Sequence, residues 1–236
     1  MKYLVLLLSM ISCFSYANCE DKFLDQTPPS PSSELREVCF NHFTVLYDGN
    51  KKIPIYSAEY LSIKDAINSE GIQRNDAFHV EYQLPDSEQS SPADYSKSGY
   101  DKGHLTPSHD APTVTDQRDT FSMSNMVPQT PKSNEVAIRI VEAKVHEIVE
   151  TGTGAHIVTG VIVGDNPNTI GRGVVVPDDT FKAVHFDDGT TCVWVFPNTV
   201  QLSETVLLSL DQFNHQYGIL PFPGLPTEDK ISPRCR

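Results

Sequence analysis

The sequence predicts an α+β fold built around a largely antiparallel central sheet. Strand-like segments come first, one strongly amphipathic helix interrupts them, and more strand-like segments follow before a last helix. Strands that follow one another through short turns pair antiparallel, whereas a parallel sheet needs a repeated strand–helix–strand order that is absent from this sequence. The length of 236 residues suits one domain of ordinary size.

The first 17 residues have the pattern of a cleavable secretory signal peptide. A lysine at position 2 precedes the apolar run 3–14, and Ser-Tyr-Ala at 15–17 is a small-x-small cleavage site. We expect cleavage after Ala17 and a secreted or periplasmic protein. A lipoprotein modified at Cys13 is the alternative. No other apolar run approaches the length of a membrane span.

Four cysteines remain after residue 17, and an even number in an exported chain indicates two disulfides. Their wide spacing fits no compact zinc motif. Four cysteines allow three pairings, and loop-closure entropy weakly favours Cys19–Cys39 with Cys192–Cys235. Free buried thiols are the alternative.

The chain is predicted to consist of an N-terminal arm and a single domain. Residues 18–39 are rich in proline, serine and charge and form the arm, while residues 40–236 form the domain. The runs 40–47 and 53–62 flank Asp48-Gly49-Asn50 and predict a hairpin. The remaining predicted strands are 79–84, 156–163, 173–176, 181–186 and 191–196, the last two joined by a turn at 187–189.

Two helices are predicted. Residues 134–150 carry an apolar stripe at helical spacing, formed by Ile138, Val141, Val145, Ile148 and Val149. Ser203 is the expected cap of a final helix that runs to about Tyr217, with Glu204 in its first turn.

The formal net charge of −13 argues against a broad electrostatic surface for nucleic acid. Any site for a polyanion therefore needs a local basic patch or a metal ion.

The segment YDKGHLTPSHD, residues 100–110, concentrates titratable side chains. Gly103 allows a close approach beside His104, while Asp101 and Lys102 shift the histidine pKa in opposite directions. A zinc site from His104, His109 and Asp110 is one interpretation, although this spacing has no recurring geometric basis. A serine–histidine–acid triad is poorly supported because no G-x-S-x-G elbow occurs.

Downstream amides and a glutamate supply further candidates. Asn125 lies in SNMVPQ at 124–129, and Asn134 lies near the start of the predicted helix. Asn134 is either a helix N-cap or an oxygen ligand for a hard cation such as Mg²⁺. Glu142, about 12 Å further along the helix, faces the same side and would reach such an ion through water; a solvated helix glutamate is the alternative.

Together, DKGH at 101–104, SNMVPQ at 124–129, Asn134 and Glu142 resemble the DNA/RNA non-specific endonuclease family of the ββα-metal type. The spacings of nine residues from Asn125 to Asn134 and eight to Glu142 agree with that family. Arg74 with Phe78 resembles an upstream arginine segment, and the similarity runs from about residue 45 to 198.

The resemblance implies a role for each matching residue. His104 would be the general base that deprotonates the attacking water, and Asn134 would be the direct ligand of one Mg²⁺, with Mn²⁺ or another divalent ion as alternatives. Glu142 would order the water around that ion. The supporting residues are Arg74 at the phosphate, Asn125, which helps to hold the site, and Asp101, which supports the motif and its water network.

The sequence departs from the family at three positions. Lys102 replaces the usual arginine and loses its bidentate fork, Ile138 stands where tryptophan is frequent, and His146 takes a position that is arginine in some members. The expected function is a secreted, Mg²⁺-dependent, sugar-non-specific endonuclease acting on DNA and RNA. The alternatives are an inactive nucleic-acid-binding or interaction module on the same scaffold and another secreted metallohydrolase.

Overall fold

The computed structural model describes residues 19–29, 35–201, 204–226 and 230–236. The predicted signal peptide, its cleavage site and Cys13 lie outside these residues. In the part of the chain that the structure describes, no helix is long and apolar enough to cross a bilayer.

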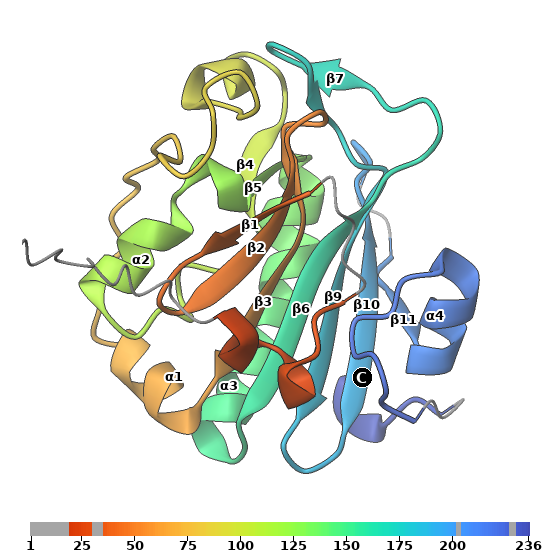
Figure 1. Ribbon diagram of the computed structural model, residues 1–236. Helices are drawn as coiled ribbons and strands as arrows, with labels where there is room; N and C mark the ends of the chain where they lie inside the picture. The colour runs from red at the N-terminus through yellow and green to blue at the C-terminus, as the bar shows by residue number, and fades with distance from the viewer. Residues whose placement is uncertain (1–18, 30–34, 202–203, 227–229) are drawn as a thin grey trace, which may run out of the picture.

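A seven-stranded antiparallel sheet forms the centre of the molecule (Figure 1). The α+β prediction with a largely antiparallel sheet is confirmed. In spatial order the strands are β1 (Arg36–Cys39), β2 (Phe43–Asp48), β3 (Ile53–Leu61), β6 (Ala155–Ile162), β9 (Asp179–Phe186), β10 (Thr191–Pro197) and β11 (Val206–Leu208).

The β2–β3 hairpin forms where the sequence predicts it. The Asp48 carboxylate accepts hydrogen bonds from the backbone amides of Asn50 at 2.9 Å and Lys51 at 3.0 Å, which closes the turn. The β9–β10 hairpin is also confirmed, with its turn at 187–190.

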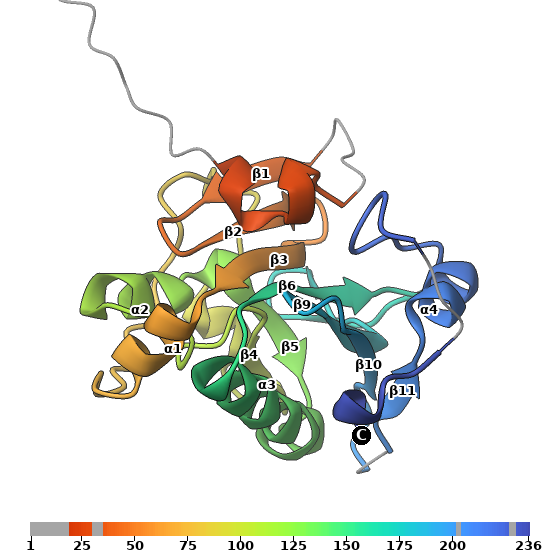
Figure 2. The same cartoon turned by 90° about the horizontal axis from the view of Figure 1, so that it is seen from below.

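The two faces of the sheet carry different layers (Figure 2). One face packs against α1 (Ile63–Ser69) and α3 (Arg139–Thr151), and the short hairpin of β4 (Asp101–His104) and β5 (Met126–Gln129) lies on the same side, with α2 (Val114–Thr120). The other face packs against α4 (Leu210–Tyr217) and the N-terminal segment through Phe23. A further two-stranded ribbon joins β7 (Thr169–Ile170) and β8 (Val174–Val175).

The predicted apolar stripe explains why α3 packs on the sheet. Val141, Val145 and Val149 are buried against Val184 and Trp194 of the facing strands. Ile138, at the position where the resemblance implies a frequent tryptophan, is buried in the same cluster.

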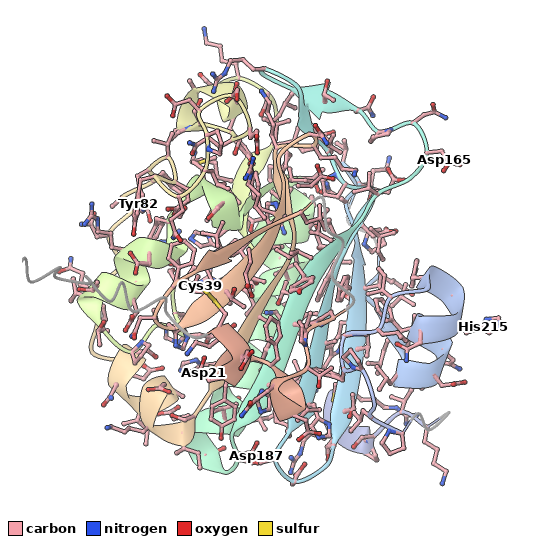
Figure 3. The ribbon with its side chains drawn as sticks, viewed as in Figure 1. Asp21, Cys39, Tyr82, Asp165, Asp187 and His215 are labelled. Carbon is pink, nitrogen blue, oxygen red and sulfur yellow. A yellow bond between two sulfur atoms is a disulfide. The ribbon has the colours of Figure 1, made fainter. Side chains whose placement is uncertain are left out.

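Both disulfides have the pairing that loop closure favours. Cys19 joins Cys39 and Cys192 joins Cys235, with Cα–Cα distances of 5.9 and 5.4 Å. Figure 3 shows the sulfur bond at Cys39, which ties the N-terminal segment to the first strand of the sheet.

Several sequence predictions differ from the structure. Residues 79–84 form no strand and contribute one isolated bridge, His79 to Ser122. Residues 36–39, assigned to the arm, are β1 of the sheet. The last helix begins at Leu210 because Ser209 is its cap, accepting from the Gln212 amide at 3.1 Å, and Glu204 precedes β11. Ser203 lies outside the described residues.

Candidate active site

The β4–β5 hairpin holds the DKGH segment against the MVPQ segment. Asp101 pairs with Gln129 and His104 pairs with Met126 in antiparallel register. A side chain at Gly103 would not fit, because a Cβ there would lie 1.9 Å from Oε1 of Gln129. Glycine is therefore favoured at position 103 because the buried Gln129 side chain occupies the space of a Cβ. The sequence alone predicts only that something approaches closely beside His104.

His104 lies among aromatic rings. The Phe121 ring meets the imidazole edge-on at a centroid distance of 4.8 Å, and the Phe78 ring lies 6.0 Å away. Burial, with a further contribution from the Arg74 charge, lowers the pKa of His104 to about 3. The imidazole is therefore uncharged at neutral pH and has a lone pair that can accept a proton.

The buried Nε2 of His104 is the ring atom that needs a partner. Within the described ranges, no group hydrogen-bonds to it. Buried polar atoms of this kind are rare and often mark functional positions. The atom is suited to a water molecule or another polar group supplied from outside the chain.

Two cations flank the aromatic rings around His104. The Arg74 guanidinium lies over Phe121 at 5.2 Å, and the Lys102 ammonium lies over Phe78 at 4.5 Å. Arg74 is oriented by Asp76 at 2.6 Å. The two side chains form a local basic patch beside the imidazole, as the overall acidity of the chain requires for a polyanion site.

Asn125 is a structural residue of the site. Its side chain is fully buried, and its Oδ1 accepts from the Thr106 amide at 3.0 Å. Its Nδ2 donates to the carbonyls of Thr106 and Thr120, both at 2.9 Å. Asn125 thereby fixes the backbone two residues after His104.

Asn134 does not cap the helix. It lies in a π-helical turn, Ser133–Ile138, and its backbone amide donates to the Thr130 carbonyl at 2.9 Å. Its side-chain Nδ2 donates to Oδ2 of Asp101 at 3.0 Å. This contact fixes the amide so that Nδ2 faces the aspartate and leaves the carbonyl oxygen as the donor for an ion.

Glu142 lies in a strongly perturbed environment. Burial, opposed by Lys182 and reinforced by Asp110 and Glu59, raises the pKa of the Glu142 carboxyl to about 7. The same Arg74 charge that lowers the pKa of His104 also lowers that of Glu142, so the guanidinium is electrostatically close to both groups. An added divalent cation would favour the ionised carboxylate.

The donor set therefore fits a hard divalent cation. Such ions take oxygen ligands and keep much of their water. Asn134 offers an oriented amide oxygen, and Glu142 offers a carboxylate whose charge a cation would stabilise. No cysteine or histidine is needed in this set.

Beneath Glu142 the sheet presents polar side chains that sequence reasoning missed. Glu59 on β3 and Lys182 on β9 are each 1% exposed, and the Lys182 ammonium donates to Thr159 on β6 at 2.7 Å. Burial raises the pKa of Glu59, whose carboxylate lies 3.0 Å from Nε2 of His42. In each case a charged residue stands at an inward position of an otherwise apolar strand, and this pattern in the sequence could have indicated the buried polar group.

The zinc set of His104, His109 and Asp110 is not assembled. Among the described residues, neither of the two groups with metal-binding spacing includes His104. Oδ1 of Asp110 instead accepts from Nδ1 of His146 at 2.8 Å, and the His109 ring lies against the His146 ring, tilted by 36° at a centroid distance of 4.1 Å. His146 is buried, so it does not replace an arginine as an exposed cationic contact.

Together these side chains place an uncharged imidazole near two cations and, through the contact of Asp101 with Asn134, near a set of oxygen donors. This combination can activate water and stabilise negative charge on a phosphate, which is the chemistry of phosphodiester hydrolysis.

Comparisons with known proteins agree with this class of site. The model of the DNA/RNA non-specific endonuclease family matches residues 25–228, so the chain belongs to that family. A nuclease of Nostoc sp. is 34% identical over 160 residues, covering 67% of this chain and 57% of that protein. The human mitochondrial nuclease EXOG is 24% identical over 231 residues, covering 88% and 62% of the two chains.

Among solved structures, the crystal structure of the EndoG/EndoGI complex, which concerns the inhibition of EndoG, has the same fold. The TM-score is 0.68 at 20% identity, covering 87% of this chain and 91% of that one. The chain spans somewhat more than half of the Nostoc nuclease.

Proposed function

We propose that this protein is a divalent-metal-dependent endonuclease that hydrolyses phosphodiester bonds of DNA and RNA. The observation that carries the proposal is the uncharged His104 imidazole beside two phenylalanine rings that carry Arg74 and Lys102, on a hairpin whose Asp101 orients Asn134. Membership of the family and similarity to proteins named as nucleases support it.

In this mechanism His104 accepts the proton of the attacking water, because its imidazole is neutral throughout the physiological range. Arg74 and Lys102 bind the phosphate and stabilise the charge that develops on it. Contacts to the phosphate carry little sequence information, so cleavage should depend little on base sequence or sugar.

The oxygen of Asn134 would hold the ion directly, and Glu142 would hold it through water. Mg²⁺ is the expected ion, with Mn²⁺ as a substitute. When bound, the ion supplies stabilisation of negative charge and help in protonating the leaving oxygen. Asp101 orients Asn134 so that its side-chain oxygen can hold the ion. The products of cleavage would carry 5′-phosphate ends.

Export from the cytoplasm is also part of the proposal. The signal-like pattern at residues 1–17 and two disulfides support a secreted or periplasmic location, where disulfides persist.

The test is digestion of supercoiled plasmid and of RNA by the purified protein. We expect nicking and fragmentation of both in Mg²⁺, none in EDTA, and recovery when Mg²⁺ is restored. Asn134→Ala should lose activity, whereas the matched control Asn166→Ala, at an exposed position, should keep it. Binding of nucleic acid without turnover in either Mg²⁺ or Mn²⁺ would instead indicate an interaction module.

A further inference from the structure

A second cluster of ligand atoms lies next to the candidate active site but shares none of its residues. Oε1 of Glu70, at the end of α1, lies 3.2 Å from Nε2 of His109 and 3.5 Å from Nε2 of His146 on α3. All three ligand atoms lie within 4.8 Å of one another. Two imidazoles and a carboxylate are a frequent donor set for zinc.

The distances suit a tetrahedral ion. With ligand bonds of about 2.0–2.1 Å, two ligands of a tetrahedral zinc lie about 3.3 Å apart. The distance from Oε1 of Glu70 to Nε2 of His109, 3.2 Å, and that to Nε2 of His146, 3.5 Å, fall on either side of this value. The fourth position would be left for water or another ligand.

The surroundings of His146 orient its imidazole as a metal ligand would be oriented. It is 4% exposed, and its Nε2 has no hydrogen-bond partner in the described ranges of the chain. Its other ring nitrogen, Nδ1, pairs with the buried Asp110 carboxylate at 2.8 Å. A carboxylate on the second nitrogen is the usual arrangement behind a metal-bound histidine, because it places the proton on Nδ1 and the lone pair on Nε2.

The site has an entry route and an electrostatic preference for cations. The side chains of His109 and Glu70 are 55% and 49% exposed, so an ion reaches the cluster from solvent and meets the buried His146 last. Glu70, Asp110 and Glu150 all act on His146 with negative charge.

We propose that Glu70, His109 and His146 bind a borderline divalent ion of the Zn²⁺ class, with Asp110 as the orienting partner of His146. The site selects against Mg²⁺, which prefers oxygen donors, whereas the Asn134 and Glu142 site selects for it. The proposal does not rest on nuclease activity.

An ion bound by Glu70, His109 and His146 would hold together three segments that are separate in sequence. His109 lies five residues after His104 on the same stretch, and the Arg74 guanidinium donates to Ser108 at 3.3 Å. His146 lies one helical turn after Glu142 on α3. The ion would therefore fix α1 and the stretch after His104 to the helix that carries Glu142.

The test is equilibrium dialysis of the protein against Zn²⁺, with excess Mg²⁺ in the buffer to fill any Mg²⁺ site. The visible spectrum of the Co²⁺-substituted protein then reports whether the ion has tetrahedral nitrogen and oxygen ligands. Wild type should bind one Zn²⁺ per chain. Asp110→Asn, which removes the partner that orients His146, should weaken Zn²⁺ binding by ~10–100-fold. His109→Ala and His146→Gln each remove a ligand and should weaken Zn²⁺ binding by more than that.

Two controls locate the ion. His215→Ala, on the outward side of α4 (Figure 3), should bind Zn²⁺ as wild type does. Asn134→Ala should also retain Zn²⁺, even though it is expected to lose Mg²⁺-dependent cleavage.

Absence of stoichiometric Zn²⁺ binding in wild type would overturn the proposal and leave a hydrogen-bonded cluster. Full Zn²⁺ binding by His109→Ala, or its loss in Asn134→Ala, would overturn it as well. Because His109 is on the exposed rim, this variant decides the question even if the buried His146→Gln does not fold.

Discussion

Replacing Asn125 by alanine should destabilise the protein and misplace His104. The substitution removes three buried hydrogen bonds and leaves the Thr106 amide, the Thr106 carbonyl and the Thr120 carbonyl without their partner. Each lost bond of this kind contributes about 1 kcal/mol net, and each buried group left unpaired costs about 1–3 kcal/mol. For the three groups left unpaired, the expected loss in the free energy of unfolding is about 3–9 kcal/mol.

The assay is urea unfolding followed by the fluorescence of Trp194, the one tryptophan of the chain, which is 3% exposed in the core. Asn125→Asp keeps an acceptor for the Thr106 amide but sets a buried carboxylate against the carbonyls of Thr106 and Thr120, so it should destabilise at least as much as alanine. Asn166→Ala is the matched control and should change stability by less than about 0.5 kcal/mol.

Activity of the folded variant provides a second readout. Because Thr106 follows His104 by two residues, we expect Asn125→Ala to lower kcat while the Mg²⁺ dissociation constant stays near that of wild type. A loss of less than about 1 kcal/mol in Asn125→Ala, with an unchanged urea dependence, would refute the view that this amide holds the site.

Three further predictions concern the ion, the proton and the hairpin. Asp101→Ala should raise the Mg²⁺ concentration for half-maximal cleavage by about 10–100-fold, because Asn134 loses its orienting partner; an unchanged Mg²⁺ titration would argue against that orientation. Since the pKa of Glu142 is about 7 without an ion, protons compete with Mg²⁺ below that pH. The Mg²⁺ affinity measured by calorimetry should therefore fall as the pH is lowered from 8 to 5, by up to about tenfold per pH unit below 7. The low pKa of His104 keeps its imidazole neutral over this range. An Mg²⁺ affinity independent of pH would exclude Glu142 as the group whose protonation is coupled to binding. Gly103→Ala should lower the free energy of unfolding by about 1–3 kcal/mol, because the methyl group collides with Gln129, and an alanine variant as stable as wild type in urea would show that Gln129 moves aside freely.

The periodic parts of the fold could be predicted from sequence. The β2–β3 hairpin, the apolar stripe of α3 and both disulfide pairs follow from local patterns and loop lengths. The short helices α1 and α2 were missed although each has a local signal. Ser62 and Thr113 cap them by accepting from the amides of Asp65 and Asp116, both at 3.1 Å.

Contacts between distant segments could not be predicted. The π-helical turn that aims Asn134 at Asp101 depends on tertiary packing, since the two residues are 33 positions apart. Likewise, the contact between Asp110 and His146 could not be predicted, because the two residues lie 36 positions apart. Sequence spacing predicted the candidate residues but not the neighbours that set their charge.

The most direct test of the proposed mechanism is the cleavage rate of His104→Ala on plasmid DNA at saturating Mg²⁺, measured together with Mg²⁺ affinity. Loss of a general base typically lowers the rate by about 10²–10⁴-fold. We expect a loss of that size in kcat with Mg²⁺ affinity near that of wild type, because Asn134 and Glu142 remain in place. A variant that cleaves at the wild-type rate would contradict the assignment of His104 as the base.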